Sequence, residues 1–265
     1  MPLYVQDTGG TGRPVVLIHG WPLSSAAWSK QIPALTQAGY RVIAYDRRGF
    51  GRSDKPATGY DYDTLTQDLD RLMTDLDLRD ATLVGFSMGG GEVARYVATH
   101  GEDRLRSVVF ASAVPPYLKK SDDNPEGPLD DATAEEFETN LRADRQAFFE
   151  QFTREFFTAG DTLKVTGEER DEALELCKQS SPDAALGCMQ AWATTDFRDD
   201  LIKIEIPALV LHGLADGIVP FEGSGQRTHR MVTHAELVTI PDAPHGCNTS
   251  HPEAFNKALL DFLKD

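Results

Sequence analysis

The chain has few cysteines and no long hydrophobic run. Its three cysteines in 265 residues show no C-x-x-C spacing, so we expect reduced thiols rather than a disulfide framework. No run of 18 apolar residues is present, and no secretory hydrophobic segment follows Met1, which predicts a cytoplasmic protein with no membrane association. The H-E-x-x-H motif and other clusters with metal-ligand spacing are also missing, so we expect neither metal nor cofactor.

Basic residues are scarce relative to acidic ones. The chain has 26 Lys and Arg against 42 Asp and Glu, a formal net charge of −16. This balance argues against nucleic acid and anionic membranes as partners. The acidic residues are spread along the chain, so a preference for cationic substrates does not follow. The length suits one α/β domain with an insertion, and it leaves a homo-oligomer open.

The most informative segment combines a strand, a tight turn and a helix. The apolar run 81–86 predicts a strand buried on both faces, and residues 92–99 have helical spacing. Between them, Ser87 is the centre of a G-x-S-x-G motif, with Gly85 and Gly89 leaving room for a strained backbone and close helix packing. This context predicts a nucleophilic serine with an exposed hydroxyl. A phosphate-binding loop is the weaker interpretation, because G-x-G-x-x-G and a Walker lysine are missing.

A nucleophilic serine needs a base, and His245 has the best placement. It lies in a turn after the apolar segment 237–240, at the carboxyl end of a predicted strand, where α/β sheets bind ligands. His19 and His212 also end apolar runs, but a glycine follows each, so we interpret them as turn residues. We expect the remaining four histidines to be solvated: His100, which should end a helix, His229, His234 and His251.

The orienting acid is chosen by the same placement rule. Asp216 lies on a loop beyond the apolar run 208–211, which predicts a position at the carboxyl end of another strand. Asp242 is the alternative, but a D-x-x-H turn usually shapes its own loop. The oxyanion hole is predicted from two backbone N–H groups, those of Met88 and Trp21, because Pro22 has no N–H to donate.

Five segments of the chain form a recognisable set: H-G-W-P-L (19–23), Y-D-R-R-G-F-G-R-S (45–53), G-F-S-M-G-G-G-E-V-A-R-Y (85–96), H-G-L-A-D (212–216) and I-P-D-A-P-H-G (240–246). Together they resemble one group of α/β-hydrolases: the cofactor-free haloperoxidases, aryl esterases and γ-lactamases. The resemblance implies a mostly parallel eight-stranded sheet covered by helices, with a helical cap inserted after strand 6. The order Ser87, Asp216, His245 is also the triad order of this fold.

The order of apolar patterns along the chain supports an α/β fold. Strand-like runs alternate with helical patterns, apart from the aromatic-rich stretch 119–200, which breaks the alternation. We predict a hydrolase core from 1–116 and 201–265, a cap from 117–200, and a capping box of Ser250 and Glu253. The predicted strands are 15–19, 41–45, 81–86, 107–111, 208–212 and 237–240, and the predicted substrate-pocket residues are Trp21, Pro22, Phe86 and Trp192.

These features predict a serine hydrolase that acts on carboxylic esters, lactones or lactams through an acyl-enzyme. The resemblance adds perhydrolase and haloperoxidase side activity, in which a peracid formed at the serine oxidises halide in solution. A hydroxynitrile lyase and a ligand-binding protein of the same fold are the alternatives. A lyase would give no burst with a nitrophenyl ester, and a binding protein would not turn over several equivalents.

Overall fold

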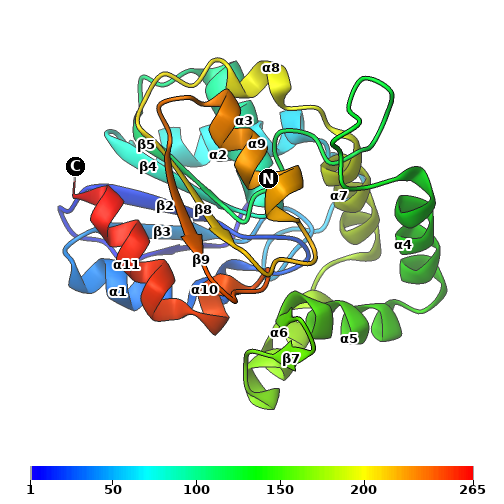
Figure 1. Cartoon of the computed structure of the whole chain (residues 1–265). Coiled ribbons are helices and arrows are strands. Elements are labelled where there is room, and N and C mark those ends of the chain that lie inside the picture. The colour runs from blue at the N-terminus through cyan, green and yellow to red at the C-terminus, as the bar shows by residue number, and fades with distance from the viewer. Residues whose placement is uncertain (1, 265) are drawn as a thin grey trace.

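A seven-stranded sheet forms the centre of the computed structural model, which describes residues 2–264 (Figure 1). The strand order is β1-β3-β2-β4-β5-β8-β9; β1 is antiparallel to β3, and all other pairs are parallel. Continuous apolar runs form the central strands, because these are covered on both faces. The bounds are β1 (Val5–Asp7), β2 (Pro14–Ile18), β3 (Arg41–Tyr45), β4 (Ala81–Phe86), β5 (Leu105–Ala111), β8 (Ala208–Gly213) and β9 (Glu236–Ile240).

The α/β prediction is confirmed, and each of the six predicted strands is present. The expectation of eight strands is wrong for residues 2–264, where the sheet has seven. Only β1 precedes β2 within these residues, and Gly9 and Gly10, which have positive φ angles, form the turn between the two strands. The cap segment consequently follows the fifth strand of the sheet, β5, rather than a sixth. Sequence reasoning missed β1, whose three residues are partly or fully exposed at the sheet edge.

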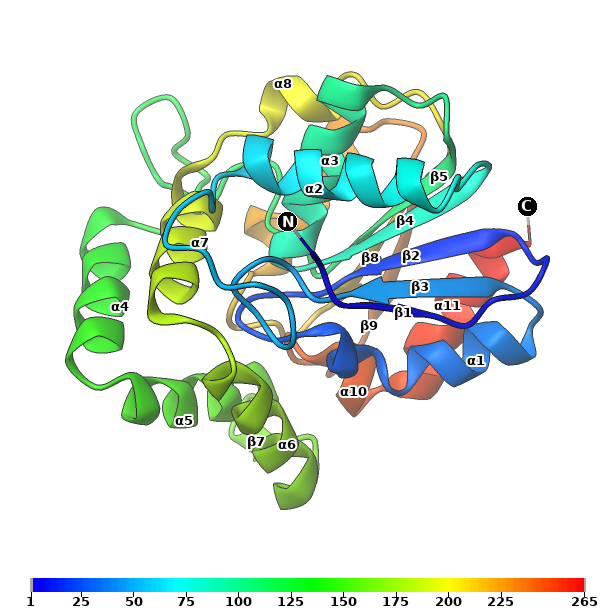
Figure 2. The ribbon, with the colours of Figure 1, turned by 180° about the vertical axis from the view of Figure 1, so that it is seen from behind.

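Helices cover both faces of the sheet, as Figures 1 and 2 show. One face carries α1 (Gln31–Gln37), α10 (Cys247–Ser250) and α11 (Pro252–Leu263). The opposite face carries α2 (Tyr62–Asp75), α3 (Met88–His100), α8 (Arg198–Leu201) and α9 (Gly225–Met231).

The predicted capping box at the start of the last helix is wrong. Helix α11 begins at Pro252, its N-cap residue is His251, and no side chain caps it. Ser250 instead belongs to α10 and bonds the His251 ring. A proline in the first turn makes part of the capping unnecessary, because it has no N–H to satisfy.

The segment between β5 and β8 is mainly helical and lies beyond the carboxyl ends of the parallel strands (Figures 1 and 2). Asp130, Asp144, Thr166 and Ser181 each accept a backbone hydrogen bond at the start of one of its helices. Besides α8, which covers a sheet face, its elements are α4 (Asp131–Ala143), α5 (Arg145–Phe156), β6 (Thr158–Ala159), β7 (Thr162–Leu163), α6 (Gly167–Lys178) and α7 (Pro182–Thr194).

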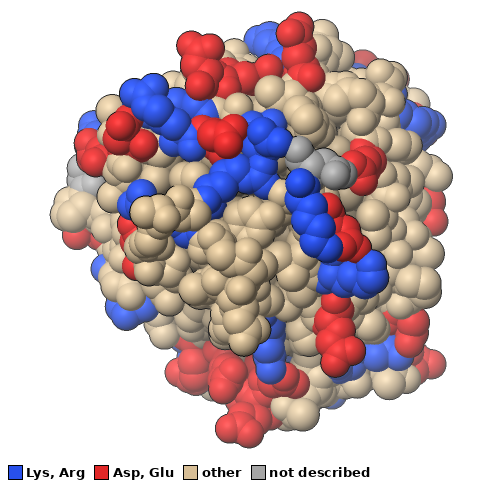
Figure 3. Space-filling view, turned by 90° about the vertical axis from the view of Figure 1, so that its left-hand side faces the viewer, with Lys and Arg blue, Asp and Glu red and all other residues tan. Residues whose placement is uncertain are grey.

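Charged side chains of both signs intermix over the face opposite these helices (Figure 3). The net negative charge is therefore not gathered into a single acidic surface on this face. Within residues 2–264, no helix is long and apolar enough to cross a membrane.

Candidate active site

Ser87 lies on a strained turn between β4 and α3. Its backbone has φ 53° and ψ −118°, a conformation that few non-glycine residues adopt. Close packing around the turn explains the two glycines of the motif. A Cβ at Gly85 would lie 2.4 Å from the Gly89 carbonyl oxygen, and one at Gly89 would lie 2.6 Å from the Ile18 carbonyl oxygen. The motif therefore holds the serine in the geometry that the sequence predicted.

The structure brings Ser87, His245 and Asp216 together from three separate loops. His245 Nε2 lies 2.9 Å from Ser87 Oγ, and His245 Nδ1 lies 2.7 Å from Asp216 Oδ2. Because a carboxylate only accepts hydrogen bonds, Nδ1 carries the hydrogen, and Nε2 is left free to accept the serine proton. The three residues are 6%, 1% and 7% exposed, in the order Ser87, His245, Asp216. The serine is therefore less exposed than predicted.

Asp216 is held as a carboxylate. Its Oδ1 accepts the N–H groups of Ile218, at 2.9 Å, and Val219, at 2.8 Å. Burial alone would raise its pKa, but the charge of His245 and the hydrogen bonds of His212 and His245 outweigh burial and lower the pKa. An ionised acid beside Nδ1 stabilises the imidazolium that forms when His245 takes a proton.

The rival candidates lie elsewhere. Asp242 is exposed and pairs with Lys164, so it does not orient the imidazole. His19, predicted to be a turn residue, is buried, and its Nε2 accepts the Arg47 backbone N–H at 3.0 Å. His212 is also fully buried, and it lies against Asp216, a contact that sequence reasoning missed. The turn between His212 and Asp216 brings their side chains together, and the spacing of hydrophobic residues gives no information about such a turn.

The two predicted oxyanion donors belong to different segments of the chain. Met88 is the first residue of α3, and Trp21 follows β2 in the neighbouring loop. Neither backbone N–H has an acceptor within residues 2–264. A pair of free amides beside a serine hydroxyl is the arrangement that binds a developing oxyanion.

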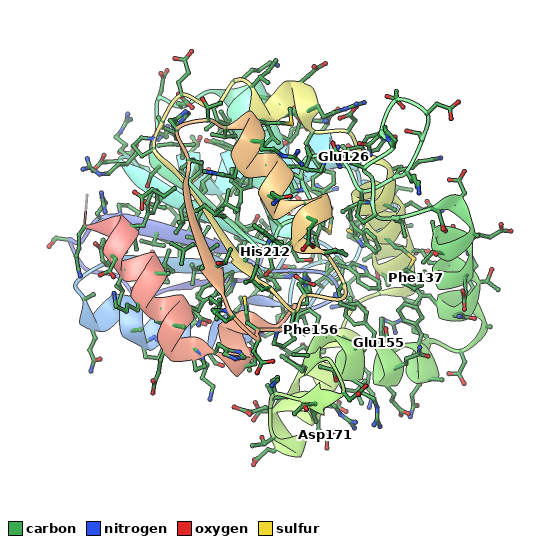
Figure 4. The ribbon with its side chains drawn as sticks, in the orientation of Figure 1. Glu126, Phe137, Glu155, Phe156, Asp171 and His212 are labelled. Atoms are coloured by element: carbon green, nitrogen blue, oxygen red, sulfur yellow. The ribbon has the colours of Figure 1, made fainter. Side chains whose placement is uncertain are left out.

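A cavity of about 240 Å³ opens at Ser87. Aromatic and aliphatic side chains dominate its wall, and Glu136 and Glu155 add carboxylates from the cap helices (Figure 4 labels Glu155 and Phe137). The indole N–H of Trp21 donates to the Ala185 carbonyl at 2.9 Å, which ties the wall to α7. The wall consists of Trp21, Ser87, Val114, Leu118, Pro128, Leu129, Thr133, Glu136, Phe137, Asn140, Phe148, Gln151, Phe152, Glu155, Trp192 and residues 217–220.

The predicted pocket residues divide into two pairs. Trp21 and Trp192 line the cavity, whereas Pro22 and Phe86 do not. Phe86 instead packs on His245, with ring centroids 5.2 Å apart, and Phe156 packs on the same ring at 4.9 Å. Sequence reasoning missed the segment 217–220, although its position after β8 was a usable signal.

The cysteine nearest the site is not a reactive thiol. Cys247 is fully buried and lies 3.5 Å from Ser112 Oγ. Burial raises its pKa to about 12, so the thiol stays protonated at neutral pH.

Known proteins resemble this chain in both sequence and structure. A profile described as the alpha/beta hydrolase fold matches residues 13–252. A non-heme chloroperoxidase of Kitasatospora aureofaciens is 44% identical over 257 residues, which cover 96% of this chain and 93% of that protein. A bifunctional esterase/perhydrolase of Acinetobacter calcoaceticus is 35% identical over 268 residues, with 99% and 96% covered. The crystal structure of a bromoperoxidase from Bacillus anthracis matches with a TM-score of 0.97 at 54% identity, covering 99% of this chain and 95% of that one.

Proposed function

The chain belongs to the α/β-hydrolase family, and from this premise we propose that it cleaves carboxylic esters through a covalent ester of Ser87. It is a hydrolase, similar throughout its length to esterase/perhydrolases and non-heme haloperoxidases. The observation that carries the proposal is the continuous hydrogen-bonded series from Ser87 Oγ through His245 to Asp216, at 2.9 and 2.7 Å. A nucleophile, a base and an orienting acid in this arrangement are the parts that acyl transfer requires.

In the acylation step, Ser87 Oγ attacks the ester carbonyl while His245 Nε2 takes the hydroxyl proton. Asp216 keeps the hydrogen on Nδ1 and stabilises the imidazolium. The N–H groups of Trp21 and Met88 hold the carbonyl oxygen as it becomes negative. The imidazolium then protonates the leaving alcohol, and the acyl group remains on Ser87.

In the deacylation step, a small nucleophile replaces the alcohol. Water, deprotonated by His245, attacks the acyl-enzyme, and the imidazolium then protonates Ser87 Oγ as its bond to the acyl group breaks and a carboxylic acid leaves. Hydrogen peroxide in the same position releases a peracid, which in solution transfers one oxygen to a halide and leaves a hypohalous acid and the carboxylate. Haloperoxidase activity is thus a consequence of the hydrolase chemistry.

The cavity supports small, uncharged substrates. Its volume of about 240 Å³ falls below the roughly 300–1,000 Å³ of sites that hold drug-sized ligands. Apolar rings on its wall favour short acyl chains and aryl alcohols, lactones or lactams.

We assign residues 117–200 to a substrate-selecting cap on the core formed by 1–116 and 201–265. We also propose a cytoplasmic location, which the three free, buried thiols support.

A panel of nitrophenyl esters, lactones and bicyclic lactams tests this function, with Ser87→Ala as the inactive variant. We expect multiple turnovers on short esters and a loss of several orders of magnitude in kcat for Ser87→Ala. Survival of more than about a tenth of the wild-type rate in Ser87→Ala would contradict the role of Ser87, since a triad nucleophile contributes far more than tenfold.

Ser107→Ala is the matched control. Ser107 is also a buried serine at an end of a sheet strand, where it bonds Thr82 at 2.8 Å. It lies at the amino end of β5, away from the cavity, so its replacement should leave ester hydrolysis unchanged.

A further inference from the structure

Asp216 has a second histidine beside it, and the mechanism above does not use this residue. His212, at the end of β8, is 0% exposed, and its Nε2 lies 3.3 Å from Asp216 Oδ2. The same nitrogen lies 2.9 Å from the Val219 carbonyl oxygen. Figure 4 places His212 on the inner side of α9, near the carboxyl end of the sheet. Oδ2 therefore faces two imidazole rings, of which only that of His245 reaches Ser87.

The tautomer of His212 follows from its neighbours. Both oxygens near Nε2 can only accept, so Nε2 carries the hydrogen. Nδ1 is buried with no hydrogen-bond partner within residues 2–264, and a Cβ at Gly225 would lie 2.5 Å from it. A second hydrogen on Nδ1 would be buried without an acceptor, which is costly, so the ring is neutral. The Nε2 hydrogen is donated to the Val219 carbonyl at 2.9 Å, with Asp216 Oδ2 3.3 Å from the same nitrogen, so His212 is not a second base.

His212 also holds the loop that carries the acid. Val219 donates its N–H to Asp216 Oδ1 at 2.8 Å, and its carbonyl accepts from His212. The acid, the loop and the histidine therefore form a closed set of contacts. Residues 217–220 of this loop line the substrate cavity, so the same contacts fix part of the cavity wall.

We propose that His212 is a positioning residue that sets how strongly Asp216 holds the protonated His245. A carboxylate that shares its charge with an extra N–H attracts an imidazolium less strongly. Removing that donor leaves more negative charge for His245, so the neutral base forms only at higher pH. This proposal rests on the proposed function, because it acts through the Ser87, His245 and Asp216 series.

The following titratable or charged groups near Asp216 and His212 do not change how strongly Asp216 attracts the protonated His245. Cys247, whose charge would act on Asp216, has its pKa raised to about 12 by burial and stays neutral. Glu222, in the short 3-10 helix before α9, is exposed. Arg227 of α9 donates to Asn124 and to the Tyr117 and Gly223 carbonyls, away from Asp216. His212 and His245 are thus the two rings that lie against the acid, at 3.3 and 2.7 Å from its Oδ2.

Two variants of matched length separate the donor from the bulk of the ring. His212→Gln keeps an N–H near the position of Nε2, and His212→Met removes it. The measurement is the pH dependence of kcat/KM for an uncharged ester, together with the melting temperature of each variant. For His212→Met we expect the acidic limb of the profile to move to higher pH by about half a pH unit or more, because Asp216 then attracts the protonated His245 more strongly. His212→Gln should leave the limb close to that of the wild type.

Equal movement of the limb in both variants, or a lower kcat with an unmoved limb in His212→Met, would overturn the proposal. If His212→Met fails to fold, His212→Asn takes its place, because its shorter amide ends where Nδ1 and Cδ2 lie and does not reach Oδ2. The Ser87→Ala variant distinguishes a failure of the proposed function from a failure of the proposed role of His212. An active Ser87→Ala refutes the proposed function, whereas an inactive Ser87→Ala with an unmoved limb in His212→Met refutes only the role of His212.

Discussion

Arg47 and Glu92 form an ion pair that is closed to solvent, with both side chains 1% exposed. The Arg47 Nε donates to Glu92 Oε1 at 2.5 Å, and its Nη2 donates to the His19 carbonyl at 2.6 Å. Glu92 belongs to α3, whose first amide is that of Met88, and His19 precedes the loop of Trp21. The pair therefore joins the two backbone segments that carry the proposed oxyanion donors.

Breaking this pair on one side should destabilise the protein strongly. Arg47→Met or Glu92→Leu alone leaves an unpaired buried charge, which costs about 3–5 kcal/mol, whereas the double variant leaves none. We expect the double variant to be less destabilised than either single variant when the free energy of unfolding is measured in urea. A double variant that loses the sum of the two single effects would show that the residues act independently.

The choice of Asp216 over Asp242 is tested by the two asparagine variants. Asp216→Asn should lower kcat by about 10⁴, because an amide favours the wrong imidazole tautomer. Asp242→Asn, at an exposed site paired with Lys164, should change kcat little. Initial rates on a nitrophenyl ester give both values. The reverse ranking would transfer the role of the acid to Asp242.

The lowered pKa of Asp216 predicts a specific acid dependence of stability. Its pKa in the folded protein lies below the unfolded value of about 3.9, so ionised Asp216 stabilises the fold above that pH, and this contribution is lost as the pH falls. The difference in unfolding free energy between wild type and Asp216→Asn should therefore shrink as the pH falls from about 5 to about 2. A constant difference over that range would contradict an ionised, stabilised carboxylate.

Pro22 offers a test of the peroxide reaction. Proline fixes its own φ and restricts the preceding residue, so Pro22 constrains how the peptide groups of Trp21 point. A Trp21 carbonyl turned toward the acyl-enzyme would accept a hydrogen bond from hydrogen peroxide. Pro22→Leu should lower perhydrolysis several-fold relative to ester hydrolysis. Bromination of monochlorodimedone, which should require acetate or a similar acid, measures the rate of perhydrolysis. Nitrophenol release measures the rate of ester hydrolysis. Equal losses would mean that Pro22 only stiffens the loop.

The proposed catalytic residues could be placed from the sequence because each follows a strand with apolar residues. Ser87 comes directly after β4, Asp216 and His245 lie in the loops that follow β8 and β9, and the carboxyl ends of parallel strands meet at one edge of a sheet. The regular alternation of apolar runs and helical patterns likewise indicated the sheet. These are local patterns with a fixed spatial meaning.

The direction of individual side chains could not be predicted in the same way. Phe86 and Pro22 are adjacent to site residues in sequence, yet neither lines the cavity. His212 looks like an ordinary turn residue until the loop after it folds back and places Val219 at its Nε2. The edge strand β1 was missed because it is short and exposed, which leaves no hydrophobic signature.

The central claim is that Ser87 is the residue that becomes acylated, and stoichiometric labelling tests it most directly. Diethyl p-nitrophenyl phosphate should release one equivalent of nitrophenol per chain, because a phosphorylated triad serine hydrolyses very slowly. Peptide mass spectrometry should then locate one diethylphosphoryl group on Ser87, and Ser87→Ala should remain unlabelled while Ser107→Ala is labelled like the wild type. A label on any other residue, or labelling of Ser87→Ala at the wild-type rate, would contradict the account.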